Sequence, residues 1–109
     1  MSSSPPIKLI ATVGTNDGKS TTCCPDTWLN PFNIGVGCVV TSGSPTYNVE
    51  HTFNDIWAGE TLVWFINSGI SGATANANGN YAYPVSGIRV NITGGTGSVT
   101  CYIRQAGTR

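Results

Sequence analysis

A strict alternation of apolar and polar residues near the end of the chain limits what this sequence can fold into. Residues 87–93 and 98–104 each place an apolar residue at every second position, and "GGTG" (94–97) separates the two runs. Side chains alternate between the two faces of a β-strand, whereas an amphipathic helix repeats about every 3.6 residues. The pattern predicts two strands with one buried face each, joined as a hairpin at the glycine turn. The expected buried positions are Ile88, Val90, Ile92, Val99, Cys101 and Ile103.

Strand-like patterns recur in the rest of the chain, at residues 7–13, 33–43, 45–53 and 60–67. The last of these segments, "ETLVWFIN", is apolar on both faces, which is typical of a strand that is buried on two sides. We therefore expect Trp64 to lie in the core.

Glycine and proline interrupt the sequence at short intervals, and no segment shows helical periodicity. The chain has 14 glycines and 6 prolines. Two stretches, 14–33 and 68–83, are predicted to be irregular loops. A chain of 109 residues can bury one modest core. The sequence thus predicts an all-β fold, an antiparallel β-sandwich or jelly-roll-like single domain at residues 7–109, which follows a flexible N-terminal arm at residues 1–6.

Charged side chains are sparse, at 9% of the residues against about 25% in ordinary soluble proteins. Five acidic and five basic residues cancel to a formal net charge of zero. Nucleic acids and anionic membrane surfaces both require clustered Lys and Arg, so the composition predicts neither as a partner. A net charge near zero favours association, and we expect much of the surface to lie against other protein.

The sequence contains no apolar run of about 18 residues, so we expect no membrane-spanning segment. Its start, "MSSSPP", lacks the basic and apolar regions of a secretory signal, and we expect the protein to be made in the cytoplasm of its host cell.

The four cysteines are therefore expected to be thiols rather than disulfides. Cys38 and Cys101 fall on the apolar rows of their strands, where cysteine packs as a small hydrophobic residue. Cys23 and Cys24 fall in an irregular stretch, where we expect them to be exposed. The spacing of the four does not match the paired ligands of a zinc site, so no metal is predicted.

The segment "VGTNDGKSTT" (13–22) has some features of a phosphate-binding loop. Such a loop needs four residues between its first glycine and the Gly-Lys pair, and here only three separate Gly14 from Gly18. It must also open a helix, which Pro25 and the surrounding Thr and Cys residues disfavour. We interpret the segment as a polar turn and predict no nucleotide cofactor.

Two other arrangements could suggest catalysis. His51, the single histidine, shares a strand row with Tyr47, Val49 and Phe53, which favours a packing role over that of a general base. Asp55 and Glu60 flank Trp57, and a pair of carboxylates beside an aromatic ring suggests glycoside hydrolysis. No third polar element supports the pair, so a loop with solvated acids is the favoured interpretation. We predict no catalytic residues and no enzyme activity.

Aromatic residues at loop edges are the best candidates for a binding surface. Trp57, Tyr81 and Tyr83 all lie beside predicted loops. Aromatic side chains are enriched in protein interfaces, so we expect these three to anchor an interface. Stacking against a sugar ring is the alternative.

The C-terminal half resembles the small β-rich virion proteins of tailed bacteriophages. The resemblance rests on "GNYAYPVSGIRVNIT", on the glycine turn and on the final strand ending "IRQAG", and it covers about residues 32–107. It implies a capsid decoration, or cement, protein that binds the major capsid protein on the surface of the phage head. It further implies a homodimer or homotrimer. The family supplies no catalytic motif.

The sequence therefore predicts a non-enzymatic structural protein of a virion. The alternative is a carbohydrate-binding or receptor-binding module of a phage tail, with Trp57, Tyr81 and Tyr83 as its platform.

Overall fold

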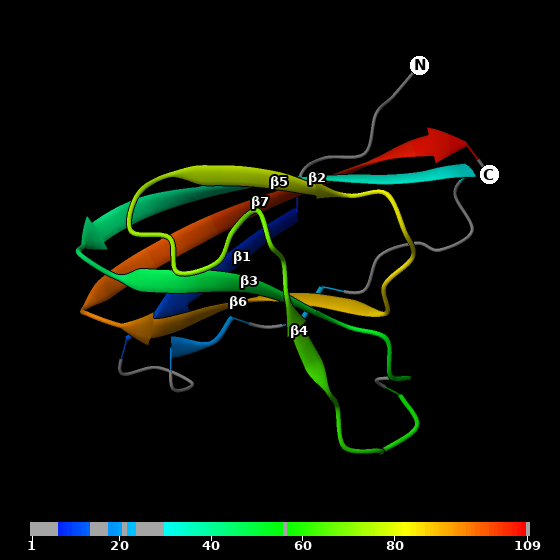
Figure 1. Ribbon diagram of the computed structural model, residues 1–109, viewed down its shortest axis with the longest axis horizontal. Coiled ribbons are helices and arrows are strands. Elements are labelled where there is room, and N and C mark those ends of the chain that lie inside the picture. The colour runs from blue at the N-terminus through cyan, green and yellow to red at the C-terminus, as the bar shows by residue number, and fades with distance from the viewer. Residues whose placement is uncertain (1–6, 14–17, 21, 24–29, 56, 109) are drawn as a thin grey trace.

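The computed structural model describes residues 7–13, 18–20, 22–23, 30–55 and 57–108. The predicted arm at residues 1–6 therefore lies outside the described residues. Within the described ranges, seven antiparallel strands form two facing sheets, which confirms the all-β sandwich as a single domain (Figure 1). The strands are β1 (Ile7–Thr12), β2 (Asn30–Gly43), β3 (Thr46–Thr52), β4 (Trp64–Ile66), β5 (Ala77–Tyr81), β6 (Gly87–Gly94) and β7 (Gly97–Thr108).

The first sheet has the strand order β1-β7-β2-β5, and the second has the order β4-β3-β6. Residues 18–20 and 22–23 extend the second sheet beyond β6, since the backbone of Ser20 bonds to Val90 and that of Cys23 bonds to Ile88. Within the described residues there is no helix that is long and apolar enough to span a membrane.

The core lies between the sheets and is built from the rows that the alternation predicted. The six positions expected to be buried in β6 and β7 all are buried; they are Ile88, Val90, Ile92, Val99, Cys101 and Ile103. Full burial of each such aliphatic side chain contributes about 1.5–3 kcal/mol. The buried apolar residues are Leu9, Ala11, Cys23, Ile34, Val36, Cys38, Tyr47, Val49, Ile70, Tyr81, Val85, Ile88, Val90, Ile92, Val99, Cys101 and Ile103.

The predicted hairpin between the last two strands is wrong. β6 pairs with β3 in the second sheet, whereas β7 pairs with β1 and β2 in the first. The glycine turn carries the chain from one sheet to the other. Alternation reports which face of a strand is buried but not which strand lies beside it, and the partners here come from distant parts of the chain.

The strand pairs β2–β7 and β3–β6 form one long two-stranded ribbon that bends between the sheets. The backbone amide of Ser44 donates to the carbonyl of Thr96 at 2.9 Å, so the two strands stay paired through the bend. Gly43, Gly95 and Gly97 all have positive φ angles there. A Cβ atom on any of them would overlap the backbone of the opposite strand, so the close approach at this corner requires glycine.

The expectation of a strand at 60–67 buried on two sides is also wrong. Only Trp64–Ile66 form a strand, β4, and it lies at the edge of the second sheet. Trp64 is half-buried rather than in the core, and Phe65 and Ile66 are each about half exposed. The first sheet does not cover this edge, so the apolar run lacks a second layer.

One strand was missed in the stretch predicted to be irregular at 68–83. β5 pairs with β2 along its length, although its sequence "ANGNY" has residues that are uncommon in strands. Backbone hydrogen bonds to the central strand hold it in place. In addition, β2 begins at Asn30, earlier than the expected start at residue 33.

Candidate functional site

Exposed aromatic side chains gather at one end of the second sheet, where the first sheet no longer covers it. His51 on β3 lies opposite Phe65 on β4, so their side chains share a face of the sheet. Phe53 continues the row of His51, and Tyr83 approaches from the chain beyond β5. We call Phe53, Phe65 and Tyr83 the aromatic patch; they are 52%, 48% and 45% exposed, respectively.

The aromatic patch is organised around a buried pair. The ring of His51 lies 5.9 Å from that of Phe65 in a stacked arrangement, 5.4 Å from that of Phe53 and 5.8 Å from that of Tyr83, between ring centroids. The hydroxyl of Tyr81 lies 2.9 Å from Nδ1 of His51, within hydrogen-bonding distance. These contacts fix the exposed rings in position, because their shared neighbour is itself held in the core.

Burial sets the protonation of both members of the pair. Desolvation lowers the pKa of His51 below its ordinary value and raises the pKa of Tyr81 well above its own. Both side chains are therefore neutral at neutral pH. A neutral imidazole packs well beneath the three rings of the aromatic patch. This agrees with the packing role that the sequence favoured for His51.

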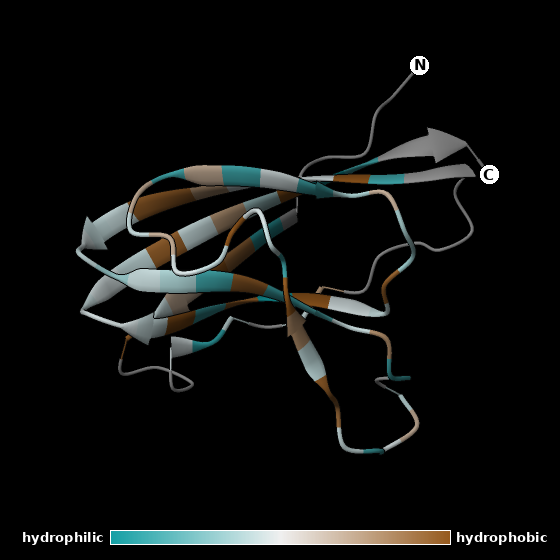
Figure 2. Cartoon of the chain, in the orientation of Figure 1, coloured by the Kyte–Doolittle hydropathy of each residue, from teal (hydrophilic) through white to brown (hydrophobic). Residues whose placement is uncertain are grey.

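The loop between β3 and β4 projects away from the sandwich next to this patch (Figure 1). Trp57 lies on it and is 83% exposed, and Val63 is 54% exposed. Figure 2 shows hydrophobic residues along β4 and the end of the loop that leads into it. The loop thus extends the apolar surface outward.

The two acids of this loop hold its shape. Glu60 accepts hydrogen bonds through Oε1 from the side-chain amide of Asn54 and the backbone amide of Asp55, both at 3.1 Å. Asp55 accepts a hydrogen bond from the backbone amide of Trp57 at 2.9 Å. Both carboxylates are exposed, in agreement with the solvated loop considered from the sequence. Their bonds brace the backbone that presents Trp57.

The three interface residues suggested by the sequence are thus divided by the structure. Trp57 and Tyr83 are available to a partner, whereas Tyr81 is 0% exposed and bonded to His51. Tyr81 therefore cannot anchor an interface or a sugar-stacking platform, because strand alternation turns it into the core. It instead supports the patch from beneath.

Sequence reasoning missed Phe53 and Phe65 as surface residues. Phe53 ends the strand row of Tyr47, Val49 and His51, and Phe65 lies in an apolar run, which favoured burial of both. The polar loop before β4 was the sequence signal that the second layer ends there.

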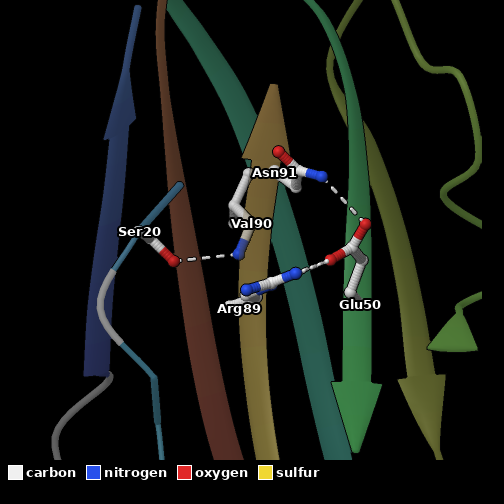
Figure 3. A network of polar contacts seen from close by, with 5 residues as sticks. All are labelled: Ser20, Glu50, Arg89, Val90 and Asn91. Carbon is white, nitrogen blue, oxygen red and sulfur yellow. Dashed lines mark hydrogen bonds and ion pairs between the residues drawn. The ribbon is translucent and has the colours of Figure 1, made fainter. Parts of the chain in front are cut away.

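A second polar arrangement lies on the outer face of the second sheet (Figure 3). Arg89 donates from Nε to Oε1 of Glu50 at 2.8 Å, and Nη2 lies 2.8 Å from the same oxygen. Asn91 donates to Oε2 at 3.0 Å. The guanidinium also lies over the ring of Trp64, 4.0 Å from its centroid. Both carboxylate oxygens are occupied, so this network joins β3, β4 and β6 rather than offering a free base.

Ser20 is hydrogen-bonded to the backbone of β6 in the same sheet. Its hydroxyl accepts a hydrogen bond from the backbone amide of Val90 at 2.9 Å, and its own amide donates to the carbonyl of Val90 (Figure 3). Val13, Gly18, Lys19, Ser20 and Thr22 are the described residues of the segment that had features of a phosphate site, and Ser20 runs along β6 instead of opening a helix. Residues 14–17 and 21 lie outside the described residues.

The three cysteines in the described part of the chain are buried thiols. Cys38 and Cys101 face each other across β2 and β7, as the apolar rows indicated. A hydrogen bond to Cys38 and, as the second cause, burial raise the pKa of the Cys101 thiol. The reactive thiolate is therefore disfavoured. The expectation that Cys23 is exposed is wrong, because its bonds to Ile88 draw it under the edge of the sheet. Cys24 lies outside the described residues.

Metal ligands do not gather in the described part of the chain, where no three His, Cys, Asp or Glu side chains are close enough to hold an ion. Comparison of the chain with protein-family models, curated proteins and solved structures finds no match.

Proposed function

We propose that this chain is a non-enzymatic structural protein of a phage virion, a decoration protein that binds major capsid subunits through the aromatic patch and the loop that carries Trp57. The observation that supports this proposal is the exposure of four aromatic side chains at one projecting end of the sandwich. Exposed apolar surface of this kind marks a protein interaction site.

The patch has the composition of an interface centre. Aromatic residues are enriched in such centres, where a few of them supply most of the binding free energy. The rings around His51 are already positioned by their contacts, so little side-chain entropy remains to be lost on binding. Asp55 and Glu60 place negative charge at the rim. The complementary capsid surface is an apolar pocket with basic residues at its edge.

The assignment to a capsid rests on the resemblance of residues 32–107 to small virion proteins. A decoration protein stabilises the shell by mass action, since it binds the assembled lattice and not the free subunits. Many copies on one shell also compensate for weak single contacts.

Binding to depleted heads tests this proposal. The purified chain is mixed with heads of its phage from which the protein has been removed, and bound chain is measured by co-sedimentation. We expect the wild-type chain to bind, and Trp57→Ser and Phe65→Ser to weaken binding at least about tenfold, as for hot-spot residues.

Ile10→Ser is the matched control. Ile10 is an apolar side chain, 58% exposed, on β1 of the other sheet. Its replacement removes similar surface away from the patch and is expected to leave binding unchanged. Equal binding by wild type and both patch variants would contradict the role of the patch. Failure of the wild-type chain to bind heads would contradict the decoration role itself.

A further inference from the structure

A groove crosses the outer face of the first sheet, on the side away from the core. Its volume is about 550 Å³, which is within the range of ligand sites. It is open to solvent along its length. Gly35 and Gly37 of β2 form the floor. Tyr102 and Arg104 of β7 form one wall, and Asn78 and Asn80 of β5 form the other.

The glycine floor is not required by the fold. Gly35 and Gly37 lie in β2, a central strand, where glycine weakens the sheet. Neither has a positive φ angle. A Cβ atom on Gly37 would meet no atom within 4 Å, and one on Gly35 would meet only the carbonyl of Arg104 at 3.9 Å. The bend glycines, by contrast, have no room for a side chain. An open floor at this position therefore leaves space for a molecule that lies across the sheet.

The walls of the groove indicate what that molecule is. Tyr102, 38% exposed, offers a ring face for stacking. Asn78 and Asn80 are exposed and carry amides that can both donate and accept hydrogen bonds. An aromatic ring combined with amides on an open sheet face suits the alternating apolar faces and hydroxyl groups of a sugar chain.

Among the described residues, the charges in and around the groove are all positive. Arg104 lies in its wall, and Nζ of Lys8 lies 5.8 Å from the centroid of the Tyr102 ring. The described acids, Glu50, Asp55 and Glu60, lie on β3 and its loop in the other half of the sandwich. A guanidinium binds a carboxylate with two parallel hydrogen bonds. Two cations are too few for the repeated phosphate contacts of a nucleic acid.

We propose that this groove binds an acidic glycan, with a sugar ring on Tyr102, its carboxylate on Arg104 and its hydroxyl groups on Asn78 and Asn80. This site is distinct from the aromatic patch, and it does not depend on the decoration role. It also differs from the platform of Trp57, Tyr81 and Tyr83, since none of those residues lines the groove.

Titration calorimetry with paired oligosaccharides tests this site. The probes are oligogalacturonate, a hyaluronan oligosaccharide and sialyllactose, each compared with its methyl ester, which keeps the sugar and removes the charge. We expect at least one acidic probe to bind and its ester to bind at least about tenfold more weakly. The affinity should fall as salt is added.

Two variants locate the binding. Gly37→Val fills the floor at a position where the added Cβ atom meets no atom within 4 Å, and it places a residue that favours strands, so it should keep or raise the melting temperature while it abolishes binding. Arg104→Gln should weaken binding to the level of the ester. Trp57→Ser is the matched control and should bind the glycan normally.

Three results would overturn the proposal: no acidic probe binds, the esters bind equally well, or Gly37→Val binds like the wild type. Tighter binding of a single-stranded oligonucleotide would assign the groove to a different class of ligand. Binding of the groove variants to phage heads is measured in parallel. Absence of glycan binding with intact head binding would contradict this site alone. Absence of head binding with intact glycan binding would contradict the decoration role alone.

Discussion

His51 illustrates at the scale of one residue how a titratable group can serve packing. It is nearly buried, at 4% exposure, and it contacts two phenylalanine and two tyrosine rings. Within the described residues, the ring contacts and the hydrogen bond of His51 involve aromatic side chains and no carboxylate. The charged form of the imidazole therefore gains no compensation for its loss of water, and burial lowers its pKa.

Stability should consequently depend on pH through this residue. The unfolded chain takes up a proton on His51 near its ordinary pKa of 6.5, and the folded chain does so only at lower pH. The free energy of unfolding is thus fully retained above that value and falls as the pH decreases toward the lower, folded pKa. Urea unfolding at about pH 7.5 and about pH 5.5 measures this change.

His51→Phe is the informative variant, since it keeps an aromatic ring and removes the titration. Its stability should change less than that of the wild type over the same interval. An equal loss in both proteins would show that another group titrates there. Tyr81→Phe serves as the control for the hydrogen bond, because it retains His51 and should retain the pH dependence.

At the scale of the elements, the bent two-stranded ribbon connects the two sheets of the sandwich. One of its strands runs from β2 into β3, and the other runs from β6 into β7. The two strands of the ribbon pass from one sheet to the other side by side, and three glycines with positive φ angles line the corner. A side chain at the corner would push the strands apart and break their pairing, so both sheets depend on it.

Replacement of a corner glycine should therefore lower the free energy of unfolding by far more than the positive φ angle alone would. Gly59→Ala is the matched control: its φ is 76°, close to the 74° of Gly95, but a Cβ atom there would meet no atom within 4 Å. We expect Gly59→Ala to lower the free energy of unfolding by about 1–2 kcal/mol, the cost of a left-handed residue.

Gly95→Ala should cost clearly more than Gly59→Ala, because its Cβ would overlap the carbonyl oxygen of Ser44. Urea unfolding compares the two, and failure of Gly95→Ala to fold would agree with the prediction. Equal costs at the two positions would show that the corner can open without loss.

At the scale of the whole molecule, low charge and exposed aromatic rings favour association. The formal net charge is zero, and large apolar side chains are exposed on both sheets, including Ile10 and Phe65. A surface with little charge repels its copies weakly. Both features support the proposed homodimer or homotrimer.

Sedimentation equilibrium measures this association. We expect a dimer or a trimer of the wild-type chain and the same oligomer for Trp57→Ser, since the loop is assigned to the capsid. A monomer at high concentration would contradict the oligomer. Dissociation of the oligomer by Trp57→Ser would instead assign the loop to contacts between copies of the chain.

The sequence by itself determined the all-β class, the buried rows of β6 and β7, and the burial of Cys38 and Cys101. Alternation is a local property with a period of two, so it can be read without knowledge of the strand's neighbours. It also identified Trp57 and Tyr83 as residues near loop edges, where they are in fact exposed.

Only the tertiary structure decided which strands pair and where the second layer ends. The glycine turn at 94–97 is compatible with either a hairpin or a passage between sheets, and the distant segment around Ser44 selects the passage. Likewise, the run around Phe65 is apolar in either setting, but it becomes exposed because β4 lies at an uncovered edge. Burial depends on what the rest of the chain places opposite a residue, and that information is not local.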